Sequence, residues 1–403
     1  MNSNSQETLR RVTQDDPSLT ILIISNNYGG ADGKFYSDNS DDYSTLGAAI
    51  ANNTHLAALR VWLSDDLPLG VANRGFYDGL KSNSSISDVQ LSCNHITIAG
   101  GVGQEILKAY QEKNSQLTAL RIIEANLQNG GDRVIVDGLR NCRNLQRFDL
   151  FHCNITDEQL LPIADALRGH HLLEALGLGN NNIGNAGCVA IAALLADRNC
   201  KLRTLQFWDN AIHNEGATTI ANSLANNKQL QNLYLYGNPT NQTQFVFSNI
   251  YSVQEVFSNI LCNASNINSL YASNHTLKTL HLEQQLGQQL GSLLSMNEGE
   301  NKSHVAIKKI LQNHPNIDME PFFDWGMEEE GERNLKALPY VVEWFEKARV
   351  AVAEGEENYH FEENKLSAIF QFAKAMPLLL EGIARYDTNE SGGSGNKRKR
   401  TEG

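Results

Sequence analysis

Few side chains in this sequence stand at the spacings that catalysis or ligand binding requires. Gly100, Gly101 and Gly103 in AGGVGQE are spaced like the glycines of a phosphate-binding loop, but the Lys-Ser/Thr pair of such a loop is missing. We therefore interpret this stretch as a turn or the start of a helix. The acidic segment at residues 38–42 lacks the spacing of a calcium loop and is expected to be a polar loop.

Histidine and cysteine do not form ligand patterns either. The six cysteines are spread singly, and the eleven histidines form no pair at ligand spacing on a helix. His170 and His171 follow a helical segment, where we expect them to face solvent. No nucleophile elbow or catalytic triad is found. The sequence therefore predicts no catalytic centre, no metal site and no cofactor.

The side chains best suited to binding recur at two fixed positions of a repeated pattern. Trp, Tyr and Arg are the residue types that contribute most of the binding energy at protein interfaces. Large exposed rings also lower solubility, so a row of them favours a partner. The alternative is that the rings stack along a sheet and cover its pleat. The candidate partner-binding residues are Arg60, Trp62, Arg121, Asp149, Phe151, Trp208, Tyr234 and Tyr236.

These residues are positioned by the repeat L-x-x-L-x-L-x-x-N-x-I. Subtracting consecutive starts gives steps of 37, 30, 31, 28, 28, 29 and 28 residues. A degenerate unit is expected at Ile267, and a last strand at Leu277. The clear units start at Leu19, Leu56, Ile86, Leu117, Leu145, Leu173, Leu202 and Leu230.

The chemistry of one unit predicts its structure. The alternating L-x-L core indicates a short strand with one buried face, and the Asn at the ninth place can hydrogen-bond backbone groups where the strand ends. Cys153 takes that place in one unit. A glycine turn and a helical segment such as NAGCVAIAALLAD follow. One unit cannot bury its apolar face alone, so we expect an α/β solenoid, a horseshoe of about nine units with a parallel inner sheet and outer helices.

This pattern resembles the ribonuclease-inhibitor-like subtype of leucine-rich-repeat proteins, over roughly residues 19–285 and most clearly over 117–238. The first unit departs from it with a long insert, and the second has Ser64 at the Asn position. The segments YASNHTLKTL (271–280) and LLSMNEGENKSHVAIKKIL (293–311) are similar to the ends of uncharacterised diatom members of this subtype. The Ran GTPase-activating proteins share the subtype, which implies a GTPase regulator as an alternative. Their long acidic tract has no counterpart here.

The chain is expected to have four parts: a lead-in at 1–18, the solenoid at 19–285, a helical C-terminal cap at 286–386 and a flexible basic tail at 387–403. Within the solenoid, the long step after Leu230 indicates an enlarged turn followed by the usual helix, although an embedded site is possible. The cap would shield the exposed solenoid end, or would form a separate helical interaction module.

The basic tail and the net charge bear on the compartment. Lys397, Arg398, Lys399 and Arg400 fit a nuclear-import signal read by an import receptor, or form a solubilising tail. The net charge of −13 argues against direct binding to nucleic acid. No signal peptide and no apolar run long enough to cross a membrane is found, so we expect an intracellular protein, cytoplasmic or nuclear.

The function that these observations favour is a non-catalytic scaffold that binds a protein partner on the inner strand face. A regulator of a small GTPase and a nuclear scaffold remain alternatives.

Overall fold

The computed structural model describes residues 1–26, 31–111, 116–239, 253–265, 267–282, 286–299 and 302–313. These residues belong to two compact units. The first comprises Met1–Leu261 and Thr276–Glu298 and contains every strand of the described chain. The second comprises Cys262–His275 and the chain from Gly299 onward.

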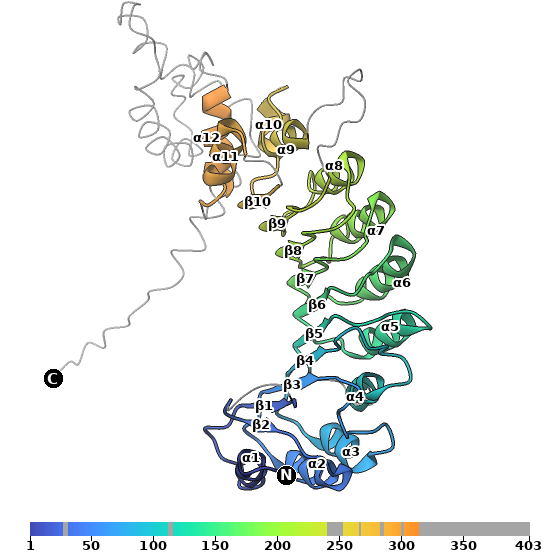
Figure 1. Ribbon diagram of the computed structural model, residues 1–403. Helices are drawn as coiled ribbons and strands as arrows, with labels where there is room; N and C mark the ends of the chain where they lie inside the picture. Colours follow the sequence, from blue (N-terminus) through green and yellow to red (C-terminus); the bar gives the residue numbers. More distant parts are fainter. Residues whose placement is uncertain are drawn as a thin grey trace, which may run out of the picture. The chain divides into compact units, whose positions relative to one another are not determined.

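The first unit is built on one parallel sheet, in which ten strands are found among the described residues. The strands follow each other in chain order, except that β2 pairs with β1 at the edge (Figure 1). They are β1 (Ile21–Ile24), β2 (Lys34–Phe35), β3 (Ala58–Trp62), β4 (Asp88–Ser92), β5 (Ala119–Ile123), β6 (Arg147–Phe151), β7 (Ala175–Gly177), β8 (Thr204–Gln206), β9 (Asn232–Tyr234) and β10 (Thr279–His281).

Helices connect successive strands, and α4 to α8 all lie on the same side of the strand column (Figure 1). The first unit contains α1 (Ser3–Thr13), α2 (Ser40–Asn52), α3 (Arg74–Ser82), α4 (Val102–Gln111), α5 (Gly131–Asn141), α6 (Asp157–Leu167), α7 (Asn185–Leu195), α8 (Asn214–Ser223), α9 (Val253–Leu261) and α11 (Gln288–Met296). The second unit contains α10 (Ile267–Ala272) and α12 (Lys302–Asn313).

The core is a column of leucines shared between neighbouring repeats. Leu176 pairs with Leu205, and Leu205 pairs with Leu233, in the register of β7, β8 and β9. All three side chains are buried. Because strand side chains alternate between faces, the residues on either side of these leucines point away from the core. The expected α/β solenoid is confirmed.

A second column, of asparagines, follows strands β7, β8 and β9. Asn210 accepts a hydrogen bond from the Ile183 amide at 3.0 Å and donates to the carbonyls of Leu178 at 2.9 Å and Phe207 at 3.2 Å. Asn181 and Asn238 make equivalent contacts one repeat away. The amide side chain thus pairs buried backbone groups that the short strands leave without partners.

The prediction of a degenerate ninth unit that starts at Ile267 is wrong. Residues 267–272 form helix α10, because Ile267, Leu270 and Tyr271 have helical rather than alternating spacing. The strand is β10, which follows Leu277, as the sequence also suggested. With β10 in the ninth place, the described chain has nine repeat strands, and β2 from the first insert is the tenth.

Both ends of the repeat region carry helices. In the lead-in, α1 packs on β2, where the Thr8 hydroxyl donates to the Lys34 carbonyl at 2.7 Å. In the segment expected to form the cap, α11 packs on α9 and α12 on α10. Residues 314–386 of that segment and the basic tail lie outside the described residues.

Candidate partner-binding face

The eight candidate residues lie in two rows on the strand face that points away from the leucine core. The middle row contains Arg60, Arg121, Asp149 and Tyr234, each at the third place of its strand. Register pairs join Arg60 to Gln90, Gln90 to Arg121, and Arg121 to Asp149. The second row, at the carboxyl ends of the strands, contains Trp62, Phe151, Trp208 and Tyr236.

Charged side chains over β3 to β6 form one continuous chain of ion pairs, which we call the charge ladder. Arg60 binds Asp88 through both terminal nitrogens, at 2.8 and 3.1 Å. Arg121 bridges Asp88 at 3.3 Å and Asp149 at 3.7 Å. The Nε of Arg147 lies 2.6 Å from Asp149 Oδ2. The ladder therefore alternates in sign along Arg60, Asp88, Arg121, Asp149 and Arg147.

Asp149 is the buried centre of the charge ladder. Its side chain is 1 % exposed, and its Oδ1 atom has no hydrogen-bond partner among the described residues. Burial raises the pKa of this carboxyl above its usual value, because desolvation outweighs the attraction of Arg147 and Arg121. The arginines above it are partly exposed.

Aromatic rings over β6 to β9 form a second cluster, which we call the aromatic platform. It consists of Phe151, Trp208 and Tyr236. Trp208 stacks on Tyr236 with ring centroids 6.1 Å apart and planes 6° from parallel. Phe151 lies 5.5 Å from Trp208, and the His152 ring meets Trp208 edge-on at 5.7 Å.

The rings of the aromatic platform both stack on each other and remain partly open to solvent. Tyr236 is 41 % exposed, while Phe151 and Trp208 are half-buried. Stacking along the sheet, the alternative considered from the sequence, is thus correct for these rings. It does not remove the exposed aromatic surface that favours a partner.

Two glycines of the β7 repeat make the aromatic platform possible. Phe151 and Trp208 belong to repeats two steps apart, or about 9.6 Å at the usual strand spacing, yet their centroids approach to 5.5 Å. A Cβ atom on Gly179 would lie 2.1 Å from the Trp208 ring, and one on Gly177 would lie 2.5 Å from Phe151. The missing side chains are the space into which the two rings lean.

The other two aromatic candidates lie apart from the platform. Ser92 and Ile123 separate Trp62 from Phe151 in the same row. Tyr234 stacks on His281 of β10, with centroids 5.0 Å apart. The structure therefore divides the eight candidates among the charge ladder, the aromatic platform, Tyr234 and Trp62.

Sequence reasoning missed the residues that hold the two clusters together. Asp88 lies two residues before Gln90, the middle-row residue of β4, and therefore falls outside the two positions per repeat from which the candidates are taken. Gly177 and Gly179 occupy the same two row positions in the β7 repeat, and only the structure shows that they provide the space for the rings. The pattern in the sequence that indicates this space is a glycine at both row positions of one repeat, next to repeats that carry aromatic residues in the second row.

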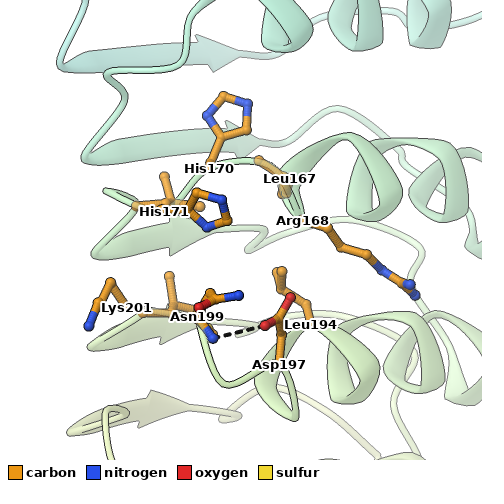
Figure 2. Close-up of a pocket in the computed structure, with 11 residues that line it drawn as sticks. Leu167, Arg168, His170, His171, Leu194, Asp197, Asn199 and Lys201 are labelled. Carbon is orange, nitrogen blue, oxygen red and sulfur yellow. Dashed lines mark hydrogen bonds between the residues drawn. The ribbon is translucent and has the colours of Figure 1, made fainter.

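Elsewhere in the described chain, a small hollow lies between the ends of α6 and α7, at the approach to β7 and β8 (Figure 2). Its volume of about 10 Å³ has room for one water molecule. His171 is exposed as expected, but His170 is buried, and burial lowers the pKa of His170. The prediction that His170 faces solvent was wrong, because its side chain lies against the backbone of Leu139 in the preceding repeat. A hollow of this size does not hold a substrate.

Cysteines of the repeat core are not poised for nucleophilic chemistry. Burial raises the pKa of the Cys153 thiol to about 12, and the same holds for Cys188. Within the described ranges, no group of three or more His, Cys, Asp or Glu residues could hold a metal ion. No helix of the described chain is both long enough and apolar enough to span a membrane.

Comparison with known proteins agrees with this geometry. The model of the Leucine Rich repeat family matches residues 141–164, 169–192 and 198–221, which cover the β6, β7 and β8 repeats. The mouse ribonuclease inhibitor is 27% identical over 186 residues, or 45% of this chain. The chain is a leucine-rich-repeat protein of the ribonuclease-inhibitor-like subtype.

Other relatives of this repeat protein carry the same kind of repeat in longer chains. The human NACHT, LRR and PYD domains-containing protein 2 is 26% identical over 68% of this chain, and the pig ribonuclease inhibitor is 28% identical over 30%. The matches span 40%, 24% and 27% of the lengths of the mouse inhibitor, the human protein and the pig inhibitor.

Proposed function

We propose that this protein is a non-catalytic scaffold that captures a protein partner on its strand face. Leucine-rich-repeat proteins generally mediate protein–protein interactions. The observation that supports this function most directly is the aromatic platform, whose three rings remain partly exposed although they stack on one another. Rings of this kind supply much of the energy at protein interfaces.

Preorganisation favours the same face. The parallel ladder fixes the backbone, and Gly177 and Gly179 fix where Phe151 and Trp208 lie. Because the rings are already ordered, the side chains of this face lose little entropy when a partner docks.

The charge ladder would contribute orientation more than affinity. Its arginines already have carboxylate partners, so they gain little from a new one. Their pattern of alternating charge would instead disfavour partners docked in the wrong register.

The test is affinity purification of the tagged protein from its source cells, followed by mass spectrometry. Replacing both Trp208 and Tyr236 with alanine should remove the partner captured by the wild type, while thermal unfolding stays cooperative. The matched control replaces Leu161 and Val189, exposed apolar residues of α6 and α7 on the helix side, and should retain the partner. A partner that survives the Trp208 and Tyr236 changes would overturn the choice of site.

The basic residues 397–400 lie outside the described residues, and their role is a separate proposal. We propose that they direct nuclear import through an import receptor. A fluorescent fusion of the full chain should be enriched in the nucleus, and deletion of residues 396–400 should abolish that enrichment. Equal distribution of the two forms would leave the segment as a solubilising tail.

A further inference from the structure

We infer that the partner segment docking on the aromatic platform is basic, with two cationic side chains about four residues apart. This inference rests on the proposed function and adds the chemistry of the partner. It follows from the carboxylates that flank the platform, their spacing, and the pairing of the arginines elsewhere on the face.

A row of turn residues borders the platform at the carboxyl ends of the strands. Glu124, His152, Asn180 and Asp209 occupy it in successive repeats, and each has a positive φ between 49° and 56°. Their amides continue the ladder: the Glu124 amide donates to the Phe151 carbonyl at 2.9 Å, and the Asp209 amide donates to the Tyr236 carbonyl at 2.9 Å. The backbone of each carboxylate is therefore fixed directly beside a platform residue.

The two carboxylates of this row are not neutralised within the described chain. Neither Glu124 nor Asp209 forms an ion pair with a residue that the structure describes. Asp209 is exposed, and its carboxylate lies over Gly237, where a Cβ atom would meet Oδ1. Glycine at that position leaves room for the carboxylate next to the backbone that follows Tyr236.

The arginines elsewhere on the face do not neutralise Glu124 and Asp209. The three arginines of the charge ladder are paired with Asp88 and Asp149, toward the amino ends of the strands. The carboxyl-end side of the face thus combines aromatic rings with two carboxylates that no cationic side chain of the described residues pairs with. Aromatic faces attract cations through their quadrupole, and nearby carboxylates add Coulomb attraction. The overall charge of −13 steers the same class of partner toward the protein.

The spacing of the two carboxylates sets the spacing of the cations. Glu124 follows β5 and Asp209 follows β8, three strands away. Three strand spacings amount to about 14 Å, and four residues of extended chain cover a similar ~14 Å. A segment with arginines at the first and fifth positions would therefore place one guanidinium on Trp208 and Tyr236 beside Asp209, and the other at Glu124.

The experiment uses the full chain with ¹⁵N-labelled tryptophan and the peptide acetyl-Arg-Gly-Gly-Gly-Arg-amide as the probe. The Trp208 indole N–H resonance is identified with Trp208→Phe. That resonance should shift saturably with the arginine peptide, and not with peptides in which citrulline or glutamate replaces both arginines. Glu124→Gln with Asp209→Asn should weaken binding by up to about fivefold per carboxylate. Asn tolerates a positive φ, so the backbone at 209 is preserved.

The matched control is Asp137→Asn with Asp165→Asn, which removes the same charge from exposed positions on α5 and α6. It should leave peptide binding unchanged apart from a small effect of net charge. Equal shifts with the citrulline peptide, no shift with the arginine peptide, or equal loss in the control would each overturn the inference. The peptide experiment can fail while the double variant Trp208→Ala with Tyr236→Ala still loses the cellular partner. In that case the proposed function stands, and only the inference that the partner segment is basic is wrong.

Discussion

At the scale of single residues, the candidate face depends on side chains that are absent. Gly177 and Gly179 leave the room that Phe151 and Trp208 occupy, and without it rings two repeats apart would not meet. Two residues without side chains thus decide the geometry of the binding surface.

Replacing Gly179 with alanine should therefore displace the Trp208 ring, since the new Cβ would lie 2.1 Å from it. We expect a loss of stability of about 1–3 kcal/mol and a changed near-ultraviolet circular dichroism spectrum. Gly70→Ala is the control, because an added Cβ there meets nothing within 4 Å. An unchanged spectrum for the Gly179 variant would contradict the arrangement of the platform.

Asp149 gives a prediction about pH. Its pKa is raised above 3.8 in the folded protein, so between 3.8 and the raised value the folded state holds a proton that the unfolded state has lost. The contribution of Asp149 to the free energy of unfolding is therefore largest below this window and falls as pH rises through it. Relative to Asp149→Asn, the wild type should become less stable as pH rises from acidic values toward neutral. A difference that is constant or has the opposite sign would show that the arginines outweigh burial.

At the scale of elements, each repeat depends on how its strand ends. Strands β7, β8 and β9 are each three residues long. Many backbone groups of the residues that follow them therefore lie beyond the hydrogen-bonded ladder of the sheet. A buried asparagine side chain pairs those groups and connects one repeat to the next.

Removal of the Asn210 amide with Asn210→Ala should leave the buried Ile183 amide without its acceptor. The carbonyls of Leu178 and Phe207 would each lose one hydrogen bond and keep the one from Asn181 or Asn238. We expect a loss of at least about 1–3 kcal/mol in the free energy of unfolding by denaturant. Asn222→Ala, at an exposed position of α8, should be neutral or slightly stabilising because alanine favours a helix. Equal effects of the two changes would rule out a structural role for the asparagine column.

At the scale of the whole repeat unit, stability is shared between neighbours, because no repeat encloses its own core. Leu205 is fully buried and pairs with Leu176 on one side and Leu233 on the other. A substitution at one leucine should therefore destabilise the adjacent repeats as well.

We expect Leu205→Ala to cost about 2–5 kcal/mol by leaving a cavity. Hydrogen exchange should accelerate in β7 and β9 as well as in β8, and less in β3 and β4. Faster exchange confined to β8 would show that the repeats are independent, and an unaltered melting curve would contradict the assigned register.

Much of this fold could be predicted from the sequence because its pattern is local and repeated. The leucine, strand and asparagine positions follow from alternation within a few residues, so the register of β7, β8 and β9 was predictable. The same reasoning failed at Ile267, where the repeat lapses and helical spacing of three apolar residues forms α10 instead. It also failed at His170, whose side chain is buried against Leu139 of the preceding repeat, a contact between different repeats.

The sequence by itself determined the repeating unit, the buried leucine column and the two rows that face away from it, because each depends on neighbours in one short segment. Only the tertiary structure decided which members of those rows meet. The pairing of Arg121 with Asp88 and Asp149, and the approach of Phe151 to Trp208 over Gly179, join residues of different repeats. Such contacts depend on side-chain length and empty space across strands, which a pattern along the chain does not contain.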